Sequence, residues 1–295
     1  MKKKSPKNQL NDLNATEWIQ ETVSVWNQKG LGVNHPDTKI ERQHPAPFSF
    51  TDVSRLIKFF TKKDNVVLDP FLGVGSTLKA CALEKRKGIG IELNPFFVKL
   101  SKQRLKNETD NKNFKDQEII KGDSRDQMLK IKSNSIDFVV TSPPYWNILK
   151  KIDHKVKQER LAKDLMKDYG NMKKDLSNIS SYETFLKELM IIFKQCFRVL
   201  KDGKYISVIV SDFRNKSKYH MFHADLMNRL ELEGFESKGL TVLYQRHKRI
   251  FPYGYPYAFV PNIHNQFILI LQKPKLKILK IPKKKKIKNL KSNAK

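Results

Sequence analysis

Residues 65–77 are NVVLDPFLGVGST, and this stretch passes from an apolar segment through a glycine-containing turn into a helical segment. The run from Asn65 to Asp69 has the length and composition of a short buried strand, and Gly75 to Lys85 is predicted to be a helix. Gly73 and Gly75 let the backbone bend tightly and approach a ligand. This order of strand, glycine turn and helix is typical of α/β proteins that bind a ligand where the strand ends.

The same alternation continues along the chain. Seven strands are predicted, at 65–69, 88–93, 118–122, 135–141, 205–210, 240–244 and 266–271. Helical segments separate most of them, and Lys201-Asp202-Gly203 is expected to end the helix that begins at Tyr182. Alternating strands and helices are typical of a mainly parallel sheet with helices on both faces. The predicted fold is therefore a doubly wound α/β sheet of seven strands.

Composition divides the chain into a main domain with two appendages. Residues 1–43 are predicted to be an N-terminal arm that packs on a domain of residues 44–272. Within that domain, residues 147–180 are polar, lysine-rich and without apolar periodicity, which indicates an inserted loop. Residues 273–295 hold eleven lysines and no acid, and we expect this tail to be disordered.

The charge of the chain favours a polyanionic partner. Lysine and arginine exceed aspartate and glutamate by 58 − 30 = 28 in 295 residues. Without the eleven lysines of the tail, the excess is still 28 − 11 = 17, which suits nucleic acid. No run of eighteen apolar residues occurs, and no apolar segment follows the lysine-rich start. These features predict a cytoplasmic protein with no signal peptide and no membrane partner.

The cysteines exclude several kinds of site. Cys81 and Cys196 cannot form a disulfide framework, and neither has the spacing of a metal ligand. We therefore predict two reduced, structural thiols and no bound metal.

Three carboxylates follow successive predicted strands and indicate a cofactor pocket. Asp69 ends the first strand, Glu92 ends the next one about twenty residues beyond the glycine turn, and Asp123 follows the third. An acid in the second position accepts hydrogen bonds from ribose hydroxyls in doubly wound folds. Ser76 or Thr77 can cap the helix after the turn. Each acid alone is also compatible with a helix cap or a solvated loop. Together they predict a pocket for a positively charged nucleoside, S-adenosylmethionine.

Residues 141–146 are TSPPYW and directly follow the apolar strand at 135–141. Prolines have no N–H, so the carbonyls around Ser142 and Pro143 are free to accept hydrogen bonds from another molecule. The exocyclic amine of a nucleobase fits this arrangement, and Tyr145 offers a ring on which the base can stack. A proline turn in which Tyr145 and Trp146 pack in the core is the alternative.

These motifs together resemble the amino-methyltransferases of DNA, the N4-cytosine and N6-adenine family. The likeness rests on the sequences DPFLGVGST, Glu92, Gly-Asp-Ser and TSPPYW, on HPAPF at 44–48, and on NIHNQF at 262–267. It covers most of residues 44–272. The cofactor motif, DPFLGVGST at 69–77, comes before the acceptor motif, TSPPYW at 141–146. The resemblance implies a Rossmann-like methyltransferase sheet with an antiparallel last strand.

Carried over residue by residue, the resemblance implies two groups of site residues. The first would hold S-adenosylmethionine and comprises Pro45, Phe48, Asp69, Phe71, Gly73, Gly75, Ser76, Thr77, Glu92, Asp123 and Ser124. The second would hold the target amine and comprises Ser142, Pro143, Pro144 and Tyr145. The Ser142 side chain and the Pro143 carbonyl would accept from the amine, so that its lone pair points at the methyl group.

The residues also bear on which base atom is methylated. Methylation of cytosine carbon 5 needs a cysteine nucleophile, generally after a proline, whereas Cys81 follows Ala80 and Cys196 follows Gln195. Serine in the first position of the tetrapeptide resembles the N4-cytosine branch, so we expect cytosine N4, with adenine N6 as the alternative. Methylation of RNA, methylation of a protein amide, and a catalytically dead DNA-binding protein are further alternatives.

Two basic segments are predicted to contact DNA. These are residues 147–180 and 244–262, and the second carries Arg246, Lys248 and Arg249 beside Tyr253. Basic groups contact phosphates, while arginine and aromatic side chains read or stack on bases. A packed loop rich in proline and glycine is the alternative for the tyrosines. The expected partners are duplex DNA, whose target base leaves the stack, and a cognate restriction endonuclease.

Overall fold

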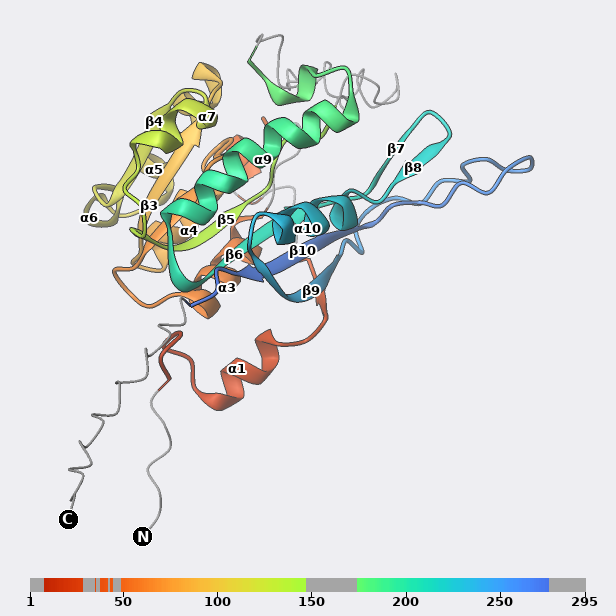
Figure 1. The fold of residues 1–295 in the computed structure, drawn as a ribbon. Coiled ribbons are helices and arrows are strands. Elements are labelled where there is room, and N and C mark those ends of the chain that lie inside the picture. Colours follow the sequence, from red (N-terminus) through yellow and green to blue (C-terminus); the bar gives the residue numbers. More distant parts are fainter. Residues whose placement is uncertain are drawn as a thin grey trace, which may run out of the picture.

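A computed structural model describes residues 8–28, 35, 38–41, 43–44, 49–146 and 174–275. Its main sheet consists of β1 (Val25–Asn27), β2 (Val66–Asp69), β3 (Lys87–Glu92), β4 (Gln117–Lys121), β5 (Ile136–Thr141), β6 (Leu200–Val210), β9 (Glu236–Tyr244) and β10 (Asn265–Gln272). Their order across the sheet is β1-β9-β10-β6-β5-β2-β3-β4. Figure 1 labels all of these strands except β1 and β2. Only β10 runs antiparallel to its neighbours among these described strands. The predicted mainly parallel α/β sheet with an antiparallel last strand is confirmed.

The predicted number of seven strands is one too few for this sheet. The additional strand, β1, belongs to the N-terminal arm and pairs in parallel with β9, where Val25 lies opposite Val242. Trp26 of β1 is buried, and the guanidinium of Arg55 lies 3.6 Å from the centre of its ring. Three residues are too few to show a strand periodicity, which is why the sequence did not reveal this strand.

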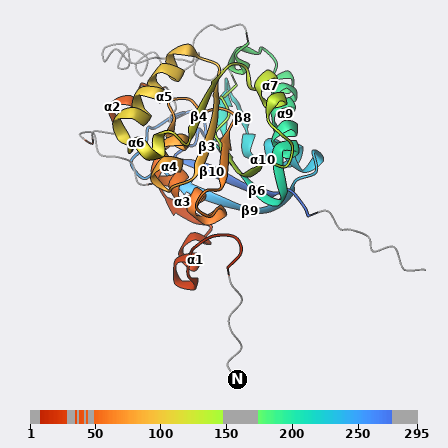
Figure 2. The same cartoon turned by 90° about the vertical axis from the view of Figure 1, so that its left-hand side faces the viewer.

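Helices cover both faces of the sheet (Figure 2). One face carries α3 (Phe50–Phe60), α4 (Ser76–Leu83) and α5 (Pro95–Glu108), and the other carries α7 (Ser124–Gln127), α9 (Tyr182–Val199) and α10 (Phe222–Leu232). Alternate side chains of β5 serve the two faces, because Phe138 and Val140 join the cluster under α3 while Val139 joins the cluster under α9. All six residues of β5 are buried, as expected of a central parallel strand.

The remaining helices in the described ranges are short. They are α1 (Ala15–Glu21), α2 (Thr38–Glu41), α6 (Asn111–Phe114), and the 3₁₀ helices η1 (Met128–Lys130) and η3 (Leu176–Asn178). None of the helices described here is both long enough and apolar enough to cross a bilayer.

The junction between α9 and β6 differs from the expectation. Helix α9 ends at Val199 and β6 begins at the next residue, so Lys201-Asp202-Gly203 is part of the strand. Gly203 adopts a φ of +75°, and its N–H donates to the carbonyl of Lys273 at 2.8 Å. The helix therefore ends directly before this region as expected, but the tripeptide belongs to β6, where the glycine allows an irregular turn of the backbone.

Two segments project from the edge of the sheet at which β5 ends. Because β6 and β9 run in the same direction as β5, the connections that follow them leave from that edge. After β6 comes a hairpin of β7 (Phe213–Asn215) and β8 (Lys218–His220). Between β9 and β10 lies a long loop of residues 245–264, which we call the aromatic loop. Both extend away from the body of the protein (Figure 1).

Candidate active site

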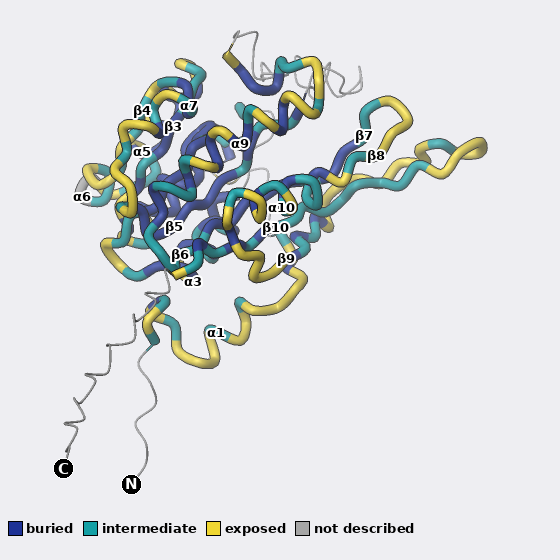
Figure 3. The backbone as a smooth tube through the Cα atoms, viewed as in Figure 1, coloured by how far each residue is buried: buried dark blue, intermediate teal, exposed yellow. Residues whose placement is uncertain are grey.

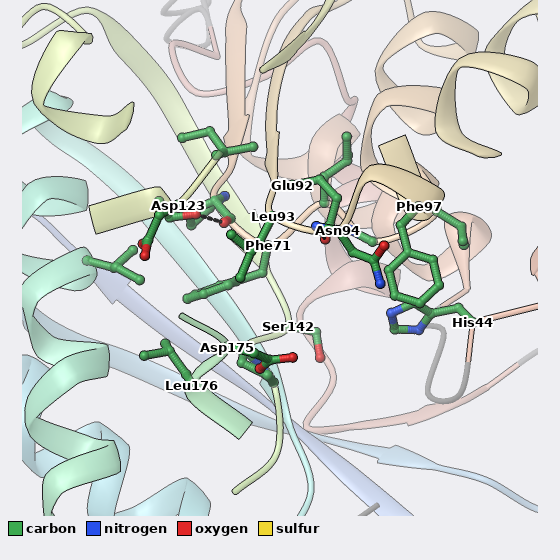
Figure 4. Close-up of a pocket in the computed structure, with 18 of the residues that line it drawn as sticks. His44, Phe71, Glu92, Leu93, Asn94, Phe97, Asp123, Ser142, Asp175 and Leu176 are labelled. Atoms are coloured by element: carbon green, nitrogen blue, oxygen red, sulfur yellow. Dashed lines mark hydrogen bonds between the residues drawn. The ribbon is translucent and has the colours of Figure 1, made fainter. Parts of the chain in front are cut away.

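A pocket opens where β2, β3 and β5 end (Figure 4). Its empty space of about 850 Å³ includes open solvent at the mouth of the pocket. Among the residues implied by the sequence, it is lined by Phe71, Gly73, Ser76, Glu92, Asp123, Ser124, Ser142 and Pro144. The structure places five others beside the pocket without lining it, namely Asp69, Gly75, Thr77, Pro143 and Tyr145. Pro45 and Phe48 lie outside the described residues.

The glycine turn presents its backbone to the pocket. Gly73 and Gly75 have φ angles of +56° and +85°, which L-residues with side chains rarely adopt. The N–H of Gly73 donates to Oε2 of Glu92 at 2.8 Å, and its carbonyl accepts from the Ser101 hydroxyl at 2.8 Å. A Cβ atom at Gly73 would lie 3.2 Å from Nε2 of His44. The turn is thus held against β3 and α5, and a side chain at Gly73 would require a strained backbone and a shift of His44.

Asp69 faces the protein interior. Its Oδ1 accepts from the Phe71 N–H at 2.9 Å and the Thr141 hydroxyl at 2.6 Å, and its Oδ2 accepts from the Thr77 hydroxyl at 2.5 Å. Burial raises the pKa of Asp69 to about 6, although these hydrogen bonds act to lower it. The carboxylate thereby joins the end of β2 to the end of β5 and to the first turn of α4. Its geometry is that of a residue that holds the two motifs together.

Glu92 lies at the pocket with both oxygens already engaged by backbone. Oε2 accepts from Gly73 and Oε1 accepts from the Asn94 N–H at 2.7 Å. Burial raises the pKa of Glu92 to about 7 despite these two donors. Each carboxylate oxygen has a second lone pair, so the group retains the capacity to accept hydrogen bonds from a ligand.

Asp123 lies on the opposite side of the pocket from Phe97 (Figure 4). It caps α7 by accepting from the Arg125 N–H at 2.9 Å, and its Oδ2 lies 2.6 Å from Nη2 of the same arginine. Burial acts to raise the pKa of Asp123, but the hydrogen bonds from Arg125 outweigh it and lower the pKa. Arg125 also contacts Glu188 of α9 at 2.5 Å. Asp123 is therefore ionised and held in one orientation.

The acceptor motif is divided between the pocket and its surroundings. Ser142 and Pro144 line the pocket, whereas Pro143 between them is buried and does not line it. The hydroxyl of Tyr145 lies 3.5 Å from Nε2 of Gln266, the second residue of β10. The indole N–H of Trp146 donates to the Ile179 carbonyl at 2.8 Å, and its ring is buried. The chain after the double proline is thus fixed by Tyr145 and Trp146.

Several lining residues were not named as site residues from the sequence, although His44 begins the HPAPF motif. His44 and Phe97 form a ring pair with centroids 4.8 Å apart, and Asn94 caps α5 next to them. Asn94 precedes a proline, which is a local signal for the start of a helix. Asp175 and Leu176 come from the end of the polar region 147–180. No local pattern identifies these two residues, and residues 147–173 of that region lie outside the described ranges.

An ion-pair network lies behind the glycine turn. Arg104 of α5 is fully buried, and its guanidinium contacts Glu41 at 2.8 Å, Glu108 at 3.1 Å and the Ser76 hydroxyl at 3.0 Å. Lys79 of α4 is also buried and contacts Glu108 at 2.6 Å. Burial raises the pKa of Glu41, while Arg104 acts to lower it. We call Glu41, Lys79, Arg104 and Glu108 the ion-pair network, and it ties α2 to α4 and α5.

The four residues of the second basic segment that were predicted to contact DNA do not line the pocket. Arg246, Lys248, Arg249 and Tyr253 are all exposed on the aromatic loop. The loop also exposes Tyr255 and Tyr257, which the sequence places in the same candidate DNA-binding segment, and three further apolar side chains, Ile250, Phe251 and Phe259.

Neither cysteine takes part in the pocket. Cys81 and Cys196 are free and fully buried, and burial raises the pKa of both thiols. Within the ranges that the structure describes, no group of three histidine, cysteine, aspartate or glutamate side chains is arranged to hold a metal ion.

The chain matches a family of known proteins. A family model described as DNA methylase matches residues 1–103 and 136–295. The chain is similar to the type II methyltransferase M.BglI of Bacillus subtilis, with 35% identity over 95 residues. It is also similar to the orphan methyltransferase M.BamHII of Bacillus amyloliquefaciens, with 39% identity over 69 residues. These matches cover 32% and 23% of this chain and 26% of each relative, so the chain spans about a quarter of their length.

A solved structure, TrmN from Thermus thermophilus, is 14% identical to this chain with a TM-score of 0.47. The match covers 76% of this chain and 48% of that one. A likeness this weak adds nothing about the site.

Proposed function

Because the chain belongs to the DNA methylase family, we propose that it transfers a methyl group from S-adenosylmethionine to the exocyclic amine of a base in duplex DNA. One observation carries the proposal. Ser142 and Pro144 of the acceptor motif line the same pocket as Gly73 and Glu92 of the cofactor motif. A direct transfer requires donor and acceptor to be held next to each other, and this pocket is where the two motifs meet.

The residues of the pocket fit S-adenosylmethionine. Glu92 has lone pairs left for the ribose hydroxyls, and Asp123, ionised and fixed by Arg125, suits the adenine amino group. Gly73 allows close approach of the backbone, and the ring of Phe71 lines the pocket between the two acids. When bound, the cofactor supplies an electrophilic methyl group on its sulfonium.

The acceptor motif supplies the orientation of the amine. The lone pair of an exocyclic amine is delocalised into the base, so the nitrogen is a poor nucleophile. In the proposal, the Ser142 hydroxyl and the Pro143 carbonyl accept hydrogen bonds from the two N–H groups and favour a pyramidal nitrogen. Asp69 acts through another residue, because its hydrogen bond to Thr141 positions the end of β5.

We propose cytosine N4 as the target atom, since Ser142 in the first position of the tetrapeptide resembles the N4-cytosine branch. Adenine N6 is the second candidate. Methylation at cytosine carbon 5 is disfavoured because it requires a reactive thiol, whereas Cys81 and Cys196 are buried away from the pocket. Pairing with a restriction endonuclease stays a prediction.

The test is to incubate the full chain with unmodified duplex DNA of mixed sequence and methyl-labelled cofactor, digest the DNA, and identify the nucleosides by mass spectrometry. The expected product is N4-methylcytosine. N6-methyladenine would transfer the assignment to the second candidate. A parallel incubation offers structured RNA in place of the DNA. Label found only in that RNA, or cofactor binding without any transfer to DNA, would overturn the proposal.

A further inference from the structure

The tip of the aromatic loop exposes an unusual amount of aromatic surface. Tyr255, Tyr257 and Phe259 are 82%, 94% and 92% exposed. Figure 3 shows that the loop extends well beyond the buried core. Large aromatic side chains gathered on a projection mark a surface that another molecule covers.

The backbone of this loop is held by its own hydrogen bonds. The side chain of Asn262 donates to the Phe251 carbonyl at 2.8 Å and accepts from the Phe251 N–H at 2.9 Å. At the tip, the N–H of Tyr257 donates to the carbonyl of Gly254 at 2.7 Å, and Gly254 has a φ of +78°. The rings are therefore presented by an ordered backbone, which lowers the entropy lost on binding.

The loop and the β7–β8 hairpin both attach to the acceptor motif. Gln266, two residues after the loop, contacts the Tyr145 hydroxyl. The ring of Trp146 packs on Phe213 and His220 of the hairpin, with centroids 6.2 and 5.8 Å apart. These contacts place the roots of both projections next to the Ser-Pro-Pro segment. A further hydrogen bond, from the guanidinium of Arg214 to the carbonyl of Pro261, joins the hairpin to the loop.

The charge of these two projections indicates which kind of molecule they bind. Residues 213–221 and 245–264 contain no aspartate or glutamate, and their cations are Arg214, Lys216, Lys218, Arg246, Lys248 and Arg249. A second copy of this surface would bring like charges together, which disfavours self-association. Phosphates pair with the cations, and unstacked bases offer faces for the rings.

We propose that the rings of Tyr255, Tyr257 and Phe259 stack on bases of the DNA beside the target, while the cations at the root of the loop contact phosphates. This inference rests on the proposed function, in which duplex DNA is the methyl acceptor. Stacking at the opened step offsets part of the cost of removing the target base from the helix.

The test compares two triple variants of the full chain. Y255A/Y257A/F259A removes the rings, and Y255F/Y257F/F259Y keeps ring faces while altering their hydroxyls. We expect the alanine variant to bind a mixed-sequence duplex roughly tenfold or more weakly, with unchanged affinity for S-adenosylmethionine, whereas the aromatic variant binds like wild type. On unmodified plasmid DNA, permanganate should reveal unstacked thymines with wild type and not with the alanine variant.

Three results would count against the inference. Equal DNA affinity and equal kcat/KM for the alanine variant would overturn it while leaving the methyltransferase proposal intact. A wild-type dimer that the alanine variant converts to a monomer, with DNA affinity unchanged, would assign the loop to self-association. If wild type itself neither binds nor methylates duplex DNA, the proposed function fails as well.

Discussion

In the pocket and directly behind it, polar groups hydrogen-bond to one another, whereas in the aromatic loop the side chains face water. Asp69, Glu92 and Arg104 each have two or more partners within hydrogen-bonding distance and are largely removed from solvent. Tyr257 and Phe259 lie at the same edge of the sheet but are almost fully exposed. A small ligand of fixed shape is best held by groups positioned beforehand, whereas a long polyanion is met by a projecting surface. Substitutions in the two regions should therefore change different properties of the protein.

The largest effect is expected in the ion-pair network. Arg104→Met leaves the buried carboxylates of Glu41 and Glu108 without their arginine, which should lower the free energy of unfolding by about 3–5 kcal/mol. Urea unfolding measures the loss. Lys102→Met is the matched control, because Lys102 lies on the exposed side of the same helix. Adding Glu41→Gln to Arg104→Met should recover part of the loss, and an effect of Arg104→Met no larger than that of the control would contradict this account.

The next largest effect is expected in the acceptor motif, which lies between the pocket and the root of the aromatic loop. Ser142→Ala removes one acceptor for the amine and should lower kcat by about 100-fold, while the Kd for S-adenosylmethionine changes by less than about twofold. Single-turnover kinetics and calorimetry separate the two quantities. Ser135→Ala, just before the other end of β5, is the control. A variant that kept the full rate would refute the proposed orientation of the amine.

A smaller effect follows from the buried carboxylate at the pocket. The pKa of Glu92 is raised by burial from 4.5 to about 7, so ionisation of this group opposes folding. Its contribution to stability is therefore fully present below about pH 4.5 and is lost as the pH rises through 7, by up to about 3 kcal/mol.

The measurement is the free energy of unfolding of wild type and of Glu92→Gln at pH 5 and at pH 8. The value for the variant is subtracted from the value for wild type at each pH. The difference should show wild type losing stability toward pH 8 relative to the variant. Saturating cofactor should reduce it, because ribose hydroxyls donate to the ionised carboxylate. An identical pH dependence of the two proteins would show that Glu92 keeps an ordinary pKa.

The smallest effect is expected in the aromatic loop. Arg249→Ala should leave the unfolding midpoint unchanged and reduce the slope of log K against log salt for duplex DNA by about one. Lys63→Ala removes the same charge from an exposed residue just before β2, at the opposite edge of the sheet. Equal slopes for the two variants would show that the loop does not contact phosphates.

The sequence predicted the layered sheet and the neighbourhood of the pocket because those features depend on local patterns. Apolar runs of strand length and the glycines at 73 and 75 are visible within a few residues. Strand β1 was not predictable, since its three residues pair with β9 more than two hundred residues later. Asp175 and Leu176 were missed for a similar reason, because only the folded chain brings them to the pocket.

The orientation of individual side chains also lay beyond the sequence. Asp69 is the first residue of the cofactor motif. Its carboxylate accepts hydrogen bonds from the hydroxyls of Thr77 and Thr141 and does not line the pocket. Tyr145 is the last letter of the acceptor tetrapeptide, and its hydroxyl contacts Gln266 of β10. Which way such a group points is decided by partners distant in the chain.

By itself, the sequence determined the α/β class, the position of the cofactor turn, the acceptor motif at the end of a strand, and the absence of a suitably placed cysteine. These follow from propensities and spacings that act over a few residues. Only the tertiary structure decided that the two motifs share a pocket, that Arg104 binds Glu41, and that the exposed rings of residues 255–259 stand on a loop rooted beside Tyr145. Such contacts depend on the order in which strands pair in the sheet, which the local pattern of residues does not encode.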